Sequence, residues 1–374
     1  MATLIKRFSA AKRVVIKIGS ALLVDGRTGK IRHEWLTALC EDIAVMRKRG
    51  QEVLIVSSGS IAMGRHVLKL HPGPLKLEES QAAAAAGQIR LAHAYQEILA
   101  LQNIEVAQIL LTPADTEERR RYLNARSTVA ALLDLGALPV VNENDTVATS
   151  EIRYGDNDRL AARVAQMISA DCLVLLSDID GLYDKDPKQS TDAKIIPEVR
   201  EITDAVLAMA GTSQTDVGSG GMVTKLKAAQ IATAAGCNMF IASGTIHHPL
   251  KAMEEGANST CFVARDTPRK ARKKWIAASL TSRGRIYVDD GAEKALKSGK
   301  SLLPAGVVRI EGPFERGDLV IVSNRDGREL GRGLTAYSSE DADRIIGHKS
   351  GEIAEILGYS GRNEMIHRDE LALN

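Results

Sequence analysis

Residues 172–177 read CLVLLS, an aliphatic run of the length and composition that is typical of a strand covered on both faces. Strands of this kind lie inside parallel sheets, because helices cover both faces of a parallel sheet. The run ends in Ser177 and is followed by Asp178. We therefore expect an α/β fold in which polar side chains gather where the strands end.

The same alternation of apolar runs and helical spacing extends through the first 264 residues. A strand, a helix and a second strand open the chain, which is the order of a βαβ unit. The pattern predicts one open, mainly parallel sheet sandwiched by helices, with ligands along the carboxyl edge of its strands. Besides 172–177, strands are predicted at 14–20, 53–56, 106–111, 138–141 and 238–242, and helices at 33–49, 81–101, 124–136, 160–170 and 224–235.

The composition changes at residues 265–274, RDTPRKARKK, where six of ten residues are basic. We predict an α/β domain at 1–264, a basic linker at 265–282, a small β-rich barrel at 283–362 and a C-terminal tail at 363–374. The barrel is expected from short β-like runs separated by glycine turns, with one helix at 339–345. A chain of 374 residues is long enough for two such domains.

Charge and cysteine usage exclude several classes of protein. A net charge of +2 gives no field strong enough to attract nucleic acid or a membrane surface. The four cysteines have no CxxC spacing, so they are interpreted as small buried residues in a reducing compartment. No apolar run is long enough for a signal peptide or a membrane span. We therefore expect a cytoplasmic protein.

Two polar clusters frame residues 140–160. Val140 and Val141 lead into NEND at 142–145, and GDND follows at 155–158. Asn and Asp are common in turns, so the simplest interpretation is two surface turns. However, so many carboxylates repel one another unless a cation lies between them. An amino group, a lysine or a metal ion could be that cation.

Two lysines lie where an anion could bind. Lys17 lies inside an apolar strand just before Gly19, where its charge is costly unless it meets an anion. Lys225 follows GSGGMVT at the start of a helix, where backbone N–H groups attract phosphate. Each lysine alone is better explained as a solvated side chain, whereas together they favour a phosphate site.

Known phosphate and hydrolase motifs are missing. The GKS at 299–301 has Lys294 where the first glycine of GxxxxGK[ST] belongs, and no GxGxxG follows the first strand. The SSGS at 57–60 is not GxSxG, and the histidines form no HxxxH pair. Two lysines, glycine loops and an Asp/Asn cluster remain, and these are the parts that phosphoryl transfer needs.

Six motifs resemble the amino acid kinase family, and most closely its glutamate 5-kinase branch. They are VVIKIGS (14–20), VSSGSIAMG (56–64), VVNENDTVA (140–148), YGDND (154–158), LLSDIDGLYDKDP (175–187) and GSGGMVTKLKAA (218–229). Residues 283–361 resemble a PUA domain. The resemblance implies an amino acid kinase fold followed by a PUA-like barrel.

The resemblance also implies which residues bind ATP and which act in catalysis. Lys17 and Lys225 would contact the phosphates, and Asp158 would hold both ammonium groups. Magnesium would be held by the phosphates of ATP rather than by side chains. The full set implied for ATP is Lys17, Gly19, Ser177, Asp178, Ser219, Gly220, Gly221, Met222, Val223, Thr224 and Lys225.

For glutamate, the resemblance implies a binding group at each end of the molecule. Ser58 and the amides near Gly59 would meet the side-chain carboxylate, Asp145 the α-amino group and Asn157 the α-carboxylate, while Asp156 would shape this end. The implied reaction is attack of the glutamate side-chain carboxylate on the γ-phosphate of ATP. The resemblance further implies feedback inhibition by proline, a homodimer or homotetramer, and functional coupling to a glutamyl phosphate reductase.

Two alternatives stay open. Another amino acid kinase, acting on aspartate, N-acetylglutamate or carbamate, would share the sheet and the lysines. A carboxylate at Asp145 favours a substrate with a free amino group, which an N-acetylated substrate lacks. RNA binding through the PUA-like domain is the second alternative. It is disfavoured because acidic residues outnumber basic ones, 13 to 11, over 285–359.

Overall fold

The computed structural model describes residues 2–147, 157–210, 221–278 and 282–374. The chain forms two compact units, Met1–Pro268 and Arg269–Asn374, which are described separately. None of the described helices is both long and apolar enough to cross a membrane.

The first unit is built on an eight-stranded sheet with the order β3-β4-β2-β1-β5-β9-β10-β8. The strands from β3 to β9 in this order are parallel, and β10 is antiparallel to β9. The open, mainly parallel sheet that we predicted is confirmed. The strands are β1 (Arg13–Ile18), β2 (Glu52–Val56), β3 (Val106–Leu111), β4 (Leu138–Glu143), β5 (Cys172–Ser177), β8 (Glu198–Val199), β9 (Asn238–Ser243) and β10 (Ser259–Phe262).

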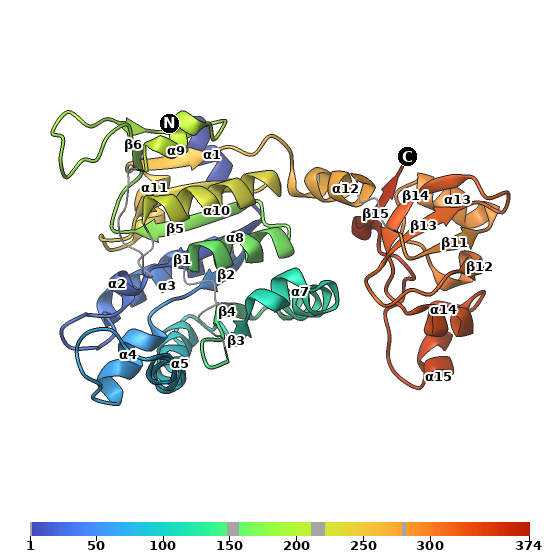
Figure 1. Cartoon of the computed structure of the whole chain (residues 1–374), viewed down its shortest axis with the longest axis horizontal. Helices are drawn as coiled ribbons and strands as arrows, with labels where there is room; N and C mark the ends of the chain where they lie inside the picture. The colour runs from blue at the N-terminus through green and yellow to red at the C-terminus, as the bar shows by residue number, and fades with distance from the viewer. Residues whose placement is uncertain (1, 148–156, 211–220, 279–281) are drawn as a thin grey trace. The chain divides into compact units, whose positions relative to one another are not determined.

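Helices cover both faces of this sheet, and successive side chains of β1 point alternately to one face and to the other. Val14, Ile16 and Ile18 pack in one core with α1, α3, α5 and α11, while Val15 packs in the other with α7, α8 and α10. Lys17 falls on the second side. In Figure 1, α8 and α10 lie side by side. The helices are α1 (Ala2–Ser9), α3 (His33–Lys48), α5 (Leu77–Ala100), α7 (Arg119–Asp134), α8 (Asn157–Met167), α10 (Met222–Ala234) and α11 (Pro249–Glu254).

The shorter elements of the first unit were not anticipated from the sequence. They include α2 (Ser20–Leu23) and α4 (Ser60–Val67), which begin directly after strands β1 and β2 and so carry residues to the sheet edge. Others are α6 (Pro113–Glu117), α9 (Asp204–Ala208) and the antiparallel pair of β6 (Leu182–Tyr183) and β7 (Ile195–Ile196), and α1, α11, β8 and β10 were likewise not predicted. The helical spacing of 81–101 predicts that Ile89, Ala92, Tyr95, Ile98 and Leu99 form one stripe packed in the core, and this is wrong for Ile89, which is 74% exposed on α5. The buried face of this helix instead includes Leu91, Tyr95 and Ile98.

The second unit has its own sheet and core. Its strands are ordered β12-β11-β13-β14-β15, with antiparallel pairs except for β11 and β13. The helix predicted at 339–345 is present as α14 (Ser339–Ile345). The strands are β11 (Gly284–Val288), β12 (Val307–Glu311), β13 (Leu319–Ser323), β14 (Glu329–Leu334) and β15 (Leu371–Leu373), and the other helices are α13 (Asp290–Lys297) and α15 (Ile353–Leu357).

Both segments expected to be irregular contain regular structure. Residues 268–278 of the expected linker form helix α12 (Pro268–Ala278), in which Ile276 is buried and Arg272 is paired with Glu370. The expected tail ends in β15, which pairs with β14. The basic residues hid α12, because a charged helix with one buried position shows little apolar periodicity.

Helices α4 and α5 pack with their backbones in close approach. A Cβ atom built on Gly87 would lie 1.8 Å from the carbonyl oxygen of Ser60, and one on Gly64 would lie 1.7 Å from that of Ala83. Both clashes are with backbone, which cannot swing aside as a side chain can. Glycine at 64 and 87 therefore sets the distance between α5 and the first turn of α4.

We predict that Gly87→Ala destabilises the first unit by roughly 1–3 kcal/mol, the usual cost of overpacking a filled contact. Urea unfolding measures the change in the free energy of unfolding from the transition of the first unit. Gly26→Ala is the matched control, because a Cβ atom there meets nothing within 4 Å and the backbone is not left-handed. Equal stability of the two variants would contradict the close approach of α4 and α5.

Candidate active site

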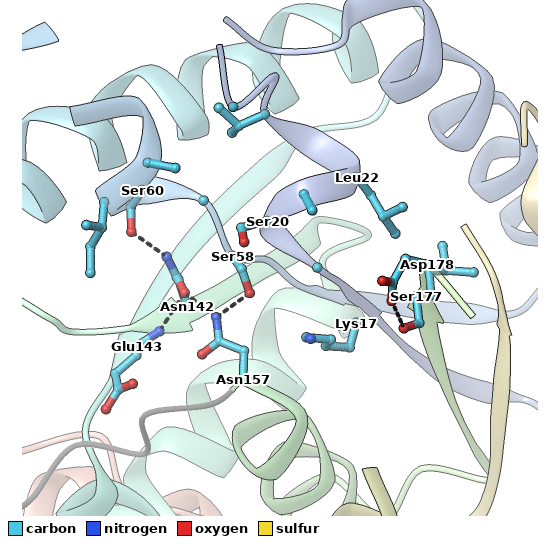
Figure 2. Close-up of a pocket in the computed structure, with 18 of the residues that line it drawn as sticks. Lys17, Ser20, Leu22, Ser58, Ser60, Asn142, Glu143, Asn157, Ser177 and Asp178 are labelled. Atoms are coloured by element: carbon cyan, nitrogen blue, oxygen red, sulfur yellow. Dashed lines mark hydrogen bonds between the residues drawn. The ribbon is translucent and has the colours of Figure 1, made fainter. Parts of the chain in front are cut away.

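A pocket of about 670 Å³ opens at the carboxyl ends of the central strands in the first unit (Figure 2). Residues that follow four strands line it: Gly19 after β1, Ser58 after β2, Asp145 after β4 and Asp178 after β5. Lys17 and Lys225 also line it. The loops that the sequence placed at one sheet edge are therefore gathered around one cavity.

Asp158 lies between the two lysines. Its Oδ1 atom is 2.6 Å from Nζ of Lys17, and its Oδ2 atom is 3.2 Å from Nζ of Lys225. The three side chains come from β1, the first turn of α8 and the first turn of α10, which meet on the second face of the sheet. Asp158 is fully buried, and the lysines are only 7% and 5% exposed.

The charges in this triad do not cancel. Burial raises the pKa of Asp158, but the attraction of Lys17 and Lys225 outweighs burial and holds the pKa below its ordinary value. The carboxylate is therefore ionised at neutral pH, and two ammonium groups surround one negative charge. Both lysines line the pocket, so an anion bound there would lie beside two ammonium groups.

A network of amides and hydroxyls lines the pocket beside this triad. Asn157 Nδ2 lies 2.8 Å from Ser58 Oγ, 2.8 Å from the carbonyl oxygen of Ser57 and 2.9 Å from Asn142 Oδ1. Figure 2 shows Asn157, Asn142 and Ser58 converging from three different segments. Asn157 is thus held by the ends of β2 and β4 beside the pocket that it lines.

Asn142 is the centre of this network, and the sequence interpretation gave it no role. It is 1% exposed, and its Nδ2 atom donates to Gln88 Oε1 at 2.8 Å. Its Oδ1 atom accepts from the backbone N–H of Glu143 at 2.9 Å. The NEND motif pointed to Asn142, whereas nothing in the helical pattern around Gln88 indicated a polar contact 54 residues away.

The other predicted residues take positions fixed by the backbone. Gly59 is the N-cap of α4 with φ of 106°, a conformation that favours glycine. Gly19 and Gly221 are the N-caps of α2 and α10. Ser177 Oγ donates to Asp178 Oδ1 at 3.0 Å, at the rim visible in Figure 2.

Residues 221–224 begin α10 but, in the part of the chain that the structure describes, do not line the pocket as Lys225 does. Within that turn, Thr224 Oγ1 lies 3.3 Å from Asp158 Oδ2. Asp156, Ser219 and Gly220 were also predicted site residues, and they lie outside the described residues.

The pocket also has a wall that the sequence did not indicate. Asp25, Arg65 and His66 line it, from the turn after α2 and from α4. Arg65 donates to the carbonyl oxygen of Gly73 at 2.8 Å. Among residues 2–147, 157–210, 221–278 and 282–374, no three His, Cys, Asp or Glu side chains gather as metal ligands.

Two family models match this chain, one in each of its two units. Residues 12–243 match the model of the amino acid kinase family, and residues 284–357 match that of the PUA domain. The chain belongs to the amino acid kinase family.

Similarity to curated proteins identifies the branch of the amino acid kinase family to which the chain belongs. A glutamate 5-kinase of Paramagnetospirillum magneticum is 60% identical over 365 residues, 98% of each chain. Glutamate 5-kinases of Rhodopseudomonas palustris strain BisB5 and Nitrobacter winogradskyi are each 59% identical, over 97% of this chain and 96% of theirs. Within the amino acid kinases, the chain belongs to the glutamate 5-kinase family.

We predict that Asp158→Asn lowers stability most at neutral pH. The folded-state pKa of Asp158 is depressed, so its stabilising effect is present above about pH 4 and is lost as pH falls through that depressed value. Removing one partner of a buried ion pair costs about 3–5 kcal/mol. Urea unfolding from pH 7 to pH 3 should show the difference from wild type shrinking below about pH 4.

The control is Asp192→Asn, because the Lys185–Asp192 pair is exposed and contributes little. A loss of stability in Asp158→Asn that stayed constant from pH 7 to pH 3 would mean that Asp158 is not held ionised by the lysines.

Proposed function

We propose that the protein transfers the γ-phosphoryl group of ATP to the side-chain carboxylate of L-glutamate, forming L-glutamyl 5-phosphate and ADP, the first step of proline biosynthesis. The observation that carries this proposal is the pair of buried lysines that share Asp158 at a pocket also lined by Asp145 and Asn157. The 60% identity between this chain and a curated glutamate 5-kinase, over 98% of each chain, supports the same activity.

The lysines supply what this reaction needs most. A carboxylate oxygen attacks the γ-phosphorus as the bond to the bridging oxygen of ADP breaks, so two anions must approach each other. Lys17 and Lys225 offset that charge as it spreads over the transferred group. The attacking carboxylate is already ionised at neutral pH, so no general base is required.

We assign the nucleotide to the side of the pocket formed by β5 and α10. Ser177 and Asp178 end β5, and Gly19 with residues 219–225 completes the predicted ATP-binding set. Magnesium, when bound, neutralises the phosphates and would be held mainly by phosphate oxygens, since the described residues offer no cluster of side-chain ligands.

Glutamate is assigned to the amide-rich side. Ser58 and the backbone N–H of Gly59 would bind the side-chain carboxylate, Asp145 the ammonium group and Asn157 the α-carboxylate. Asp156 would shape the same end. Asn157 and Asp158 are consecutive residues at the start of α8, so one helix terminus serves both the amino acid and the phosphate-binding lysines.

The inhibitor, the oligomeric state, the coupled enzyme and the location of this protein are proposed from its family membership. We infer inhibition by proline at the glutamate site, a homodimer or homotetramer, functional coupling to a glutamyl phosphate reductase that consumes the acyl phosphate, and a cytoplasmic location. We also assign catalysis to residues 1–264 and a PUA-like domain to residues 283–362.

The test is to trap the acyl phosphate as a hydroxamate in the presence of ATP and magnesium while the amino acid is varied. Glutamate should give product, and N-acetylglutamate should not, because it brings no cation to Asp145. Aspartate should fail because it is one methylene shorter, which leaves its carboxylate short of the lysines. Product with N-acetylglutamate or carbamate in place of glutamate would assign the pocket to another amino acid kinase activity.

A further inference from the structure

Tyr95 of α5 lies outside the pocket but is connected to its glutamate side. Its hydroxyl is 2.9 Å from Ser57 Oγ, and both side chains are completely buried. Ser57 follows the last residue of β2 and directly precedes Ser58 and Gly59, which line the pocket. A tyrosine hydroxyl in an otherwise aliphatic core needs a specific partner, because burying it unpaired is costly.

The direction of this hydrogen bond follows from proton counting. Ser57 Oγ also lies 3.2 Å from the carbonyl oxygen of Ser58, which can only accept. A serine hydroxyl has one proton, so Ser57 donates to Ser58 and accepts from Tyr95. Burial raises the pKa of Tyr95, which keeps its hydroxyl protonated and able to donate.

The backbone of Ser57 is already fixed. Its N–H donates to the carbonyl oxygen of Val141 at 2.9 Å, and its carbonyl accepts from Asn157. At the other end, the carbonyl of Gly59 accepts from Met63 N within α4. The peptide unit between Ser58 and Gly59 lies between these two anchored units, and its carbonyl oxygen accepts from Ser57 Oγ, the partner of Tyr95.

We propose that Tyr95 is a positioning residue for glutamate: through Ser57 it draws the Ser58 carbonyl inward and so turns the N–H of Gly59 toward the substrate carboxylate. In a trans peptide the C=O and N–H groups point in opposite directions, so fixing one directs the other. Gly59 allows this orientation because its φ of 106° is unfavourable for other residues.

This inference rests on the proposed glutamate site, and the consequence is specific to glutamate. Without the Tyr95 hydroxyl, the Gly59 N–H is no longer preset and the substrate carboxylate loses an oriented donor. The hydrogen bonds that the structure shows for Tyr95 and Ser57 run to each other, Ser58, Val141 and Asn157, and the ion pairs that it shows for Lys17 and Lys225 run to Asp158. ATP binding should therefore be unaffected.

The experiment compares Tyr95→Phe, Ser57→Ala and the double variant in steady-state kinetics with glutamate and ATP varied separately. Each single variant should raise KM for glutamate by roughly tenfold, the effect of losing an oriented bond to a charged group. KM for ATP should change by less than about twofold. KM for glutamate in the double variant should not exceed that of the more affected single variant, because each single variant already breaks the hydrogen-bond chain from Tyr95 through Ser57 to Ser58.

Tyr337→Phe in the second unit is the matched control, since it also removes the hydroxyl of a buried tyrosine, which donates to the carbonyl oxygen of Arg362. Unchanged KM for glutamate in Tyr95→Phe, equal increases for both substrates, or additive effects in the double variant would each overturn the proposal. Wild-type protein in the same assay separates failure of the proposed function from failure of the role proposed for Tyr95. If it does not phosphorylate glutamate, the proposed function fails. If it does, only the role of Tyr95 is in question.

Discussion

The attraction of two lysines to one buried carboxylate is the constraint on which the site depends. Two ammonium groups this close in a buried place would repel each other strongly without Asp158. With it, both ammonium groups are held at the lining of the pocket. This arrangement explains why a lysine occurs in the apolar strand β1 and why α8 and α10 both begin at the same edge of the sheet.

The sheet divides the chemistry between its two faces. Helices α8 and α10 bring Asp158 and Lys225 to Lys17 on one face, whereas α4 and α5 support the loop of Ser57 to Ser60 on the other. The start of α8 joins them, because Asn157 bonds to Ser58 and the next residue bonds to the lysines. Glutamate and phosphate are thus handled by neighbouring residues on one rigid element.

Much of the fold could be predicted from aliphatic runs. The bounds of β3 and β5 agree with the structure to the residue, because a strand buried on both faces has sharp compositional ends. Helix α5 was placed correctly, but Ile89 was assigned to its buried face, since helical spacing alone cannot tell which of two adjacent apolar stripes meets the core. Helix α12 was missed because its charge conceals its single buried position.

For the site, local cost was a better guide than local pattern. A lysine in an apolar strand and a lysine beside a glycine loop together favoured a phosphate site, and the resemblance to amino acid kinases added Asp158 as the partner of both. Gln88 and Tyr95 could not be found in this way. Their partners are 54 and 38 residues away, and a buried helix face accommodates a polar residue without any sequence signal.

The central claim is that the lysine pair stabilises the charge on the transferred phosphoryl group, and turnover of Lys225→Ala with saturating glutamate and ATP tests it most directly. The account predicts that kcat falls by roughly 100-fold or more, the scale of losing one preorganised charge at a transition state. Lys227→Ala, an exposed lysine on the same helix, should keep near-normal kcat. A near-normal kcat for Lys225→Ala would contradict the account.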